Sequence, residues 1–164
     1  MNKLLLFDFS ASEDWSGWDI ENDVVMGGNS SAELKRSNEG NAIFKGNVSL
    51  ENNGGFASLQ YHYSTPKDIQ GYKKVVLYLK GDGKTYQFRT KSNLEDKASY
   101  VYNFKTTGDW QTIEVPLDEM EPVYRGEKLN KPNFSANTLQ EIRFFIGNNK
   151  EQDFWLEVDK IILK

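Results

Sequence analysis

Apolar and polar residues alternate with a period of two along most of the chain, which is typical of β-strands with one buried face. In the segment 85–91, for example, Tyr86 and Phe88 alternate with Gln87 and Arg89. Similar runs are rich in Val, Ile, Phe, Tyr and Trp, and clusters of Gly, Asn, Asp and Pro separate them about every ten residues. They predict strands near 3–9, 31–37, 41–50, 56–63, 73–80, 85–91, 98–105, 110–115, 141–147 and 154–163.

The arrangement of these strands predicts an antiparallel β-sandwich or a barrel. The clearest turn lies between Lys80 and Lys84, where an Asp-Gly pair supplies the positive φ angles of a tight hairpin. Helical periodicity is nearly absent, and we expect only short helical turns at 117–120 and 136–140. The strands show no βαβ alternation, which favours an all-β fold. No linker, repeat or low-complexity tract divides the chain, so we expect one domain over residues 1–164.

Composition narrows the possible classes of function. The chain has 164 residues, no cysteine and a formal net charge of −4, with 20 basic and 24 acidic residues mixed along it. This mixture lacks the basic stripe of a nucleic-acid binder, so we expect no nucleic-acid partner. No stretch approaches the ~20 apolar residues of a membrane span, and the apolar run that ends at Asp8 is too short for an export signal. We therefore expect a cytoplasmic protein that does not span a membrane.

The residues that catalysis requires are scarce. His62 is the only histidine, no nucleophile motif surrounds a serine, and no phosphate-binding glycine loop is present. His62 alternates with two tyrosines, which indicates an exposed or half-buried strand residue. Asp159 could contribute to a calcium site, although a lone Asp near a strand end is usually only solvated. The sequence therefore predicts no enzyme, no cofactor and no metal centre.

One long loop stands out between residues 18 and 31. The apolar triplet Val24-Val25-Met26 lies between Asn22-Asp23 and a Gly-Gly pair, which is unusual for a solvent-exposed loop. We expect Asn22 and Asp23 to hydrogen-bond the loop backbone, and the glycines to allow left-handed angles and close packing. Two interpretations remain open: the loop is architectural, which we favour, or it forms part of a ligand site. Either way, Val25, Met26 and Phe56 are expected to be largely buried, with the two Gly-Gly segments near each other or near the sheet edge.

The same segment resembles the complex I intermediate-associated protein 30 family, whose signature is similar to W…N-D-x-V-M-G-G-x-S with a second block downstream. The first block matches at Trp18, Asn22, Asp23, Val25, Met26, Gly27, Gly28 and Ser30. The second block matches at Phe44, Gly46, Val48, Ser49, Leu50, Asn53, Gly54, Gly55, Phe56 and Ser58. Further similar positions are Lys80-Gly81-Asp82-Gly83-Lys84-Thr85-Tyr86, Arg89, Trp110-Gln111, Val115-Pro116-Leu117 and Arg125-Gly126.

The resemblance implies a galactose-binding-like jelly-roll sandwich and a non-catalytic role. In eukaryotes that role is the assembly of NADH:ubiquinone oxidoreductase, so the resemblance implies a protein partner such as respiratory complex I subunits. This chain lacks the Arg- and Ser-rich presequence of a mitochondrial transit peptide, so it resembles the short bacterial members.

Two functions from different classes follow as hypotheses. The first is a protein-interaction or chaperone-like assembly module. The second is a carbohydrate-binding module that uses the concave face of the sandwich. On such a face, strand alternation would place Gln87 and Arg89 together, with Tyr100 and Tyr102 on the next strand.

A simpler explanation competes with the carbohydrate face. Aromatic alternation is also typical of a sandwich core, and Arg89 could pair with a buried carboxylate, first of all Asp82, Glu114 or Asp159. The candidate binding residues are therefore Asn22, Asp23, Gln87, Arg89, Tyr100, Tyr102 and Arg125, the last from its match to the family.

Overall fold

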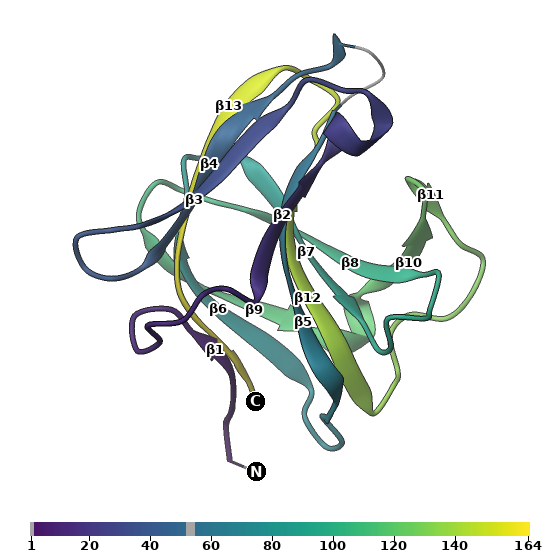
Figure 1. The fold of residues 1–164 in the computed structure, drawn as a ribbon. Helices are drawn as coiled ribbons and strands as arrows, with labels where there is room; N and C mark the ends of the chain where they lie inside the picture. Colours follow the sequence, from purple (N-terminus) through teal and green to yellow (C-terminus); the bar gives the residue numbers. More distant parts are fainter. Residues whose placement is uncertain (1, 52–54) are drawn as a thin grey trace.

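Two antiparallel β-sheets pack face to face in the computed structural model, which describes residues 2–51 and 55–164 (Figure 1). Asn53 and Gly54 of the second motif block, and the side chains of Val25 and Met26, lie outside the described part. The six-stranded sheet has the order β3 (Ser31–Arg36), β4 (Ala42–Val48), β13 (Gln152–Leu163), β6 (Lys74–Lys80) and β9 (Trp110–Pro116), with β1 (Leu4–Asp8) also paired to β13. The seven-stranded sheet has the order β11 (Glu127–Lys128), β10 (Glu121–Tyr124), β8 (Ser99–Lys105), β7 (Thr85–Lys91), β12 (Thr138–Ile146), β5 (Ala57–Asp68) and β2 (Trp18–Asn22).

The predicted all-β jelly-roll sandwich is confirmed, and the ten predicted strands all exist. The described helical segments are two short 3-10 turns, η1 (Asp23–Met26) and η3 (Leu117–Glu119). The second of these matches the helical turn expected at 117–120. The helical turn expected at 136–140 is wrong, because Thr138 and Leu139 already pair with β5 as the first residues of β12. Strands β2, β10 and β11 were not predicted.

The core lies between the sheets and consists of the alternating apolar residues of both. Phe44, Leu77, Phe88, Phe144 and Leu156 are all fully buried in it. At one end, Trp18 packs with the rings of Phe7, Phe9 and Tyr61 at centroid distances of 4.9–5.4 Å. Trp18 thus contributes to the core, and burial of such large aromatic surfaces is a main source of stability.

Among residues 2–51 and 55–164, no helix is both long enough and apolar enough to cross a membrane.

Candidate functional site

The outer face of the seven-stranded sheet, turned away from the core, carries a row of polar and charged side chains. Residues that pair directly across antiparallel strands point to the same side of a sheet. The register pairs Arg143 of β12 with Arg89 of β7 and with Gln60 of β5. It extends the same row to Asp19 of β2 and to Val101 of β8. The topology thus brings two arginines side by side near the centre of this face.

Arg143 is surrounded by partners. Its Nη1 donates to Glu21 Oε1 at 2.9 Å and to Ser58 Oγ at 3.0 Å. Its Nη2 donates to Glu141 Oε1 at 3.2 Å and to Gln60 Oε1. The side chains of Arg143 and Glu141 are only 13% and 3% exposed. Burial lowers the pKa of Arg143, but the two carboxylates raise it more, so the guanidinium stays charged.

Arg89 has a different environment. Its Nε donates to Gln87 Oε1 at 2.8 Å, and its guanidinium carbon lies 3.7 Å from the centre of the Phe145 ring. Burial and the neighbouring charge of Arg143 lower the pKa of Arg89 to about 10, so it is still protonated at neutral pH. Arg89 is therefore a half-buried cation that is held by an amide and an aromatic ring.

The prediction that Arg89 is partly buried is confirmed, but the expected ion pair is wrong. No salt bridge of Arg89 is found among the residues that the structure describes. Asp82, one of the expected partners, instead accepts hydrogen bonds from the Tyr86 hydroxyl and the Trp155 amide at the hairpin turn. Glu114 pairs with Lys74 on the other sheet, and Asp159 accepts from Ser10.

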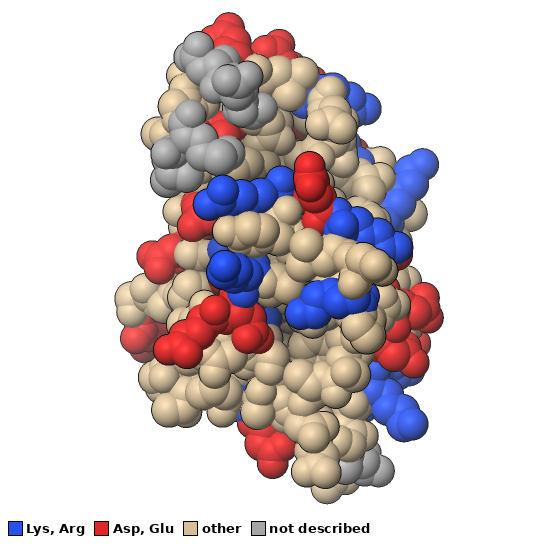
Figure 2. All heavy atoms as spheres, turned by 90° about the vertical axis from the view of Figure 1, so that its right-hand side faces the viewer, with Lys and Arg blue, Asp and Glu red and all other residues tan. Residues whose placement is uncertain are grey.

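Arg89 and Arg143 lie in a groove of about 710 Å³ on this outer face, which we call the arginine groove. Five of its lining residues are cationic and one is acidic, and together they are Glu21, Phe56, Arg89, Lys91, Lys97, Ser99, Val123, Tyr124, Arg125, Gly126, Arg143 and Phe145. Figure 2 faces the side of the molecule on which β10 and β11 lie in Figure 1, and there Lys and Arg side chains gather across the middle. The groove is thus locally basic on a chain whose formal net charge is −4.

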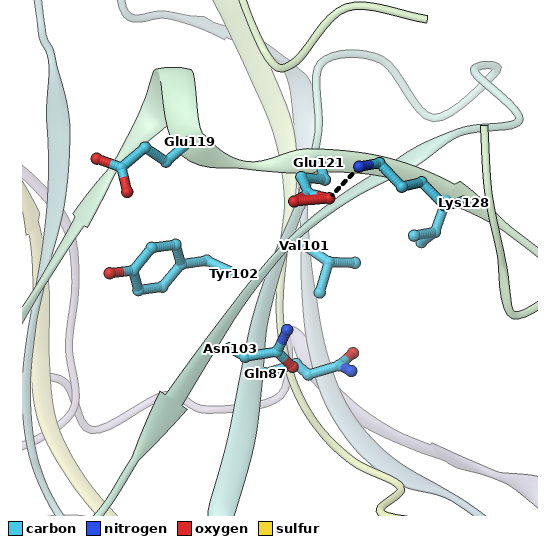
Figure 3. Close-up of a pocket in the computed structure, with 8 residues that line it drawn as sticks. Gln87, Val101, Tyr102, Asn103, Glu119, Glu121 and Lys128 are labelled. Atoms are coloured by element: carbon cyan, nitrogen blue, oxygen red, sulfur yellow. Dashed lines mark ion pairs between the residues drawn. The ribbon is translucent and has the colours of Figure 1, made fainter. Parts of the chain in front are cut away.

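A second hollow of about 410 Å³ continues along the same face (Figure 3). Gln87, Asn103 and Glu121 line it, and Glu121 pairs with Lys128 at 2.8 Å. Val123 lines both hollows, and Gln87 accepts the hydrogen bond from Arg89. The two hollows therefore form one extended concave surface.

Tyr100 and Tyr102 do not share a sheet face with Gln87 and Arg89, which corrects the expected arrangement, although Tyr102 also lines the second hollow together with Gln87. Tyr102 pairs with Phe88, a core residue, and Tyr100 pairs with the buried Thr90. Both tyrosines pack partly buried against the core, and Figure 3 shows Tyr102 pointing to the other side of β8 from Val101 and Asn103. The simpler interpretation, that this aromatic alternation belongs to the sandwich core, is the one that the register supports.

The loop between β2 and β3 is shaped by its own motif residues. Asn22 Oδ1 accepts a hydrogen bond from the Val24 amide at 3.0 Å and caps η1. Gly27 ends the turn with a φ of 86°, a conformation that favours glycine. A Cβ atom at Gly28 would lie 2.5 Å from the Asp23 carboxyl group, so only glycine fits there.

Asp23 holds this loop against the segment before β5. Its fully buried carboxylate accepts hydrogen bonds from Ser30 N at 2.9 Å, from the Ser30 hydroxyl, from Gly55 N and from Phe56 N at 3.2 Å. Burial raises the pKa of Asp23, but these hydrogen bonds lower it more, so its pKa lies below the usual range. The expected hydrogen bonds of Asn22 and Asp23 to the loop backbone are thus present, and Asp23 links Gly28 to Gly55.

The anchored loop also forms one wall of the arginine groove. Phe56, whose amide binds Asp23, stacks on Phe145 with a centroid distance of 5.3 Å and an interplanar angle of 11°. Phe145 in turn lies under the guanidinium of Arg89. Phe56 is half-buried, less than we expected, because its ring faces the groove instead of the core. Phe56 therefore belongs both to the loop that Asp23 anchors and to the wall of the arginine groove.

Arg125 lies at the rim of the groove in the turn between β10 and β11. Arg125 and Gly126 have φ angles of 51° and 81°, the left-handed values that a two-residue hairpin requires. The Arg125 guanidinium lies 5.2 Å from the ring centre of Tyr124. The turn thus presents a cation and an exposed aromatic ring to the groove.

His62 and Asp159 each contact a polar side chain of a neighbouring segment, Glu141 and Ser10 respectively. His62 is an exposed residue of β5, as expected, and its Nε2 lies 2.7 Å from Glu141 Oε1. Within the described residues, no group of three or more His, Asp or Glu side chains could hold a metal ion.

Sequence analysis missed several residues of the groove and the carboxylate that binds Arg143, namely Glu21, Lys91, Lys97, Arg143 and Phe145 of the groove and the neighbouring Glu141. A signal for three of them exists, because Glu141, Arg143 and Phe145 alternate with apolar residues in a strand that was correctly predicted. The alternation does not reveal that β12 pairs with β7. This pairing places Arg143 beside Arg89.

The two-sheet jelly-roll sandwich is a fold shared with solved carbohydrate-binding modules. The family 11 carbohydrate-binding module of a cellulosomal cellulase of Clostridium thermocellum is 18% identical, with 99% of this chain and 94% of that chain covered at a TM-score of 0.73. A structure of the family 11 module from the same organism in complex with a β-1,3-1,4-mixed-linked tetrasaccharide is 19% identical, covering 98% and 94% at a TM-score of 0.70. A family 29 carbohydrate-binding module variant is 9% identical, covering 99% and 84% at a TM-score of 0.60. At these identities the likeness concerns the fold.

The family of the chain is defined by its sequence. The family model of complex I intermediate-associated protein 30 (CIA30) matches residues 7–158, and the chain belongs to this family.

Proposed function

We propose that the chain is a non-catalytic binding module that takes up a glycan in the arginine groove. The observation that carries this proposal is the groove itself, in which hydrogen-bonding side chains surround an exposed aromatic ring. Arg89 and Ser99 supply hydrogen-bond donors, and Tyr124, 36% exposed, supplies an apolar ring face at the rim. Sugars need this combination, because their C–H faces pack on aromatic rings while their hydroxyl groups need polar partners. The fold shared with carbohydrate-binding modules supports the same proposal.

A matched pair of aromatic variants tests the proposal. Tyr124→Ala removes the exposed ring in the groove, whereas Trp110→Ala removes a ring that is 49% exposed on β9 of the other sheet. We expect the unmodified chain to bind members of an array of neutral and acidic oligosaccharides, with binding lost in Tyr124→Ala and kept in Trp110→Ala. Thermal unfolding of both variants is the control that they are folded. Absence of binding across the array, or equal binding by both variants, contradicts the proposal.

A second candidate function, docking of a protein partner such as respiratory complex I subunits, draws on a different surface. Val24 and Leu50, both in the segment that carries the family motif, are 57% and 41% exposed. Exposed apolar residues of this kind are typical of protein-interaction sites. Binding of isolated complex I subunits to the immobilised chain, lost in Val24→Asp but kept in the exposed-loop control Leu94→Asp, would support this function. Equal binding by both variants would contradict it.

A further inference from the structure

The guanidinium of Arg89 has hydrogen-bonding capacity that the protein leaves unused. Its Nε is engaged by Gln87, and one face of its plane covers Phe145. Among the residues that the structure describes, neither Nη atom donates a hydrogen bond to a protein group, and neither is a buried atom without a partner. The two Nη groups are thus presented to the groove as a planar fork whose orientation is fixed by Gln87 and Phe145.

The charges around Arg89 compensate it only in part. Glu141, whose charge raises the pKa of Arg89, binds Arg143 at 3.2 Å, and Glu21, the acidic residue of the groove, binds Arg143 at 2.9 Å. The groove adds the cations of Lys91, Lys97 and Arg125. An unpaired, partly desolvated cation is unfavourable, as the lowered pKa of Arg89 also indicates. A bound anion would supply the missing counter-charge.

We infer that the ligand of the arginine groove is an acidic glycan whose carboxylate binds the two Nη groups of Arg89. This inference rests on the proposed glycan-binding function and names the class of glycan. A carboxylate is planar and matches the arginine fork with two parallel hydrogen bonds, whereas a neutral sugar hydroxyl offers only one uncharged oxygen atom as acceptor. The surplus of cations would also raise the local concentration of an acidic chain around a protein of opposite overall charge.

The test compares sugars that differ only in the acidic group. Uronic-acid oligosaccharides of several linkages are titrated beside their carboxyl-reduced counterparts of the same length and linkage. We expect at least one pair in which the acidic member binds about tenfold more tightly or better, because the charged hydrogen bonds disappear on reduction. We also expect this preference to weaken as salt rises, since salt screens the attraction of exposed charges.

Two arginine variants connect the preference to Arg89. Arg89→Gln is expected to bind the acidic and the reduced sugar equally. Arg36→Gln is the matched control, because Arg36 also lies over an aromatic ring, at 3.8 Å from the centre of Trp15, but outside the groove. Arg36→Gln is expected to keep the full preference of the unmodified chain for the acidic sugar. Thermal unfolding of both variants is the control that they are folded.

The possible results separate this inference from the proposed function. If reduced sugars bind as well as acidic ones, or Arg89→Gln keeps the preference, the acidic ligand is excluded while glycan binding stands. If no sugar of either kind binds, the proposed function fails and the inference fails with it. If an oligoglutamate peptide binds through Arg89 and no sugar does, the groove recognises an acidic protein segment and the glycan assignment is overturned.

Discussion

The outer faces of the two sheets hold their charges in different ways. On the six-stranded sheet, Glu33 lies 3.5 Å from Lys35 and 3.7 Å from Lys45, and these side chains are 38–54% exposed. On the seven-stranded sheet, Arg143 and Glu141 are 13% and 3% exposed, and Arg143 also binds Ser58 and Gln60. The first face carries solvated ion pairs, whereas the second carries a charge network within a groove.

The difference is informative because the two arrangements have different energetic consequences. Exposed ion pairs contribute about 0–1 kcal/mol, since water already solvates both charges. Buried pairs lose that solvation, and an apolar replacement of the whole pair is often no less stable. Buried charges are thus a poor means of stabilising a sheet. Their presence on the face with the groove fits a binding surface better than a stabilising one.

Among the substitutions on the two faces, removal of Arg143 should lower the free energy of unfolding most. Arg143→Met leaves Glu141 buried with His62 as its remaining side-chain partner, and we expect the free energy of unfolding to fall by about 3–5 kcal/mol. Urea denaturation at pH 7 measures the change. The double variant Arg143→Met/Glu141→Leu removes the stranded charge as well and should recover most of the loss. A fall below about 1 kcal/mol in the single variant would mean that the network is effectively solvated, like the exposed pairs.

Replacement of Asp23 tests the support of the groove wall. Asp23→Asn exchanges one carboxylate oxygen for an amide group, which cannot accept hydrogen bonds from both the Ser30 and the Gly55 sides. We expect a loss of about 2–3 kcal/mol in the free energy of unfolding, on the scale of lost hydrogen bonds to a buried charge. Asp19→Asn, at an exposed position of β2, is the control and should have little effect. Equal stability of the two variants would contradict the anchoring role of Asp23.

Acid should remove part of the same stabilisation. The pKa of Asp23 is lowered in the folded protein, so its ionised form stabilises the fold above its unfolded pKa of about 4. That contribution is lost as the pH falls through the lower folded pKa. The difference in unfolding free energy between the unmodified chain and Asp23→Asn should therefore be constant from pH 7 to about pH 5 and shrink below about pH 4. A difference that stays constant down to the acid limit of folding would mean that the pKa of Asp23 is not lowered.

The sequence predicted the strands well because their signal is local. Alternation assigns Tyr86 and Phe88 to the core and Gln87 and Arg89 to the outer face without any knowledge of partners. Strand β2 was missed although Trp18 and Ile20 alternate with acidic residues, because the neighbouring glycines and asparagines suggested a loop. Strands β10 and β11 are short, and Pro122 together with the Arg125-Gly126 turn weakens their signal.

The groove could be predicted only in part, because it depends on which strands are neighbours. Strand β12 lies between β7 and β5, and this order places Arg143 next to Arg89 and supplies Phe145 as its support. The sequence distance between Arg89 and Arg143 gives no indication of that contact. The same information explains the error at Tyr102, because its register opposite Phe88 turns it toward the core.

The smallest effect on the free energy of unfolding is expected on the outer face of the six-stranded sheet. Glu33→Gln on the six-stranded sheet removes the acidic partner of both Lys35 and Lys45. Because all three side chains are well solvated, the free energy of unfolding should change by less than about 1 kcal/mol, and less still in high salt. Urea denaturation at low and high ionic strength, beside Arg143→Met under the same conditions, provides the measurement. A loss from Glu33→Gln as large as that from Arg143→Met would show that the exposure of a charged pair does not determine its contribution to stability. The energetic difference between the two outer faces would then be contradicted.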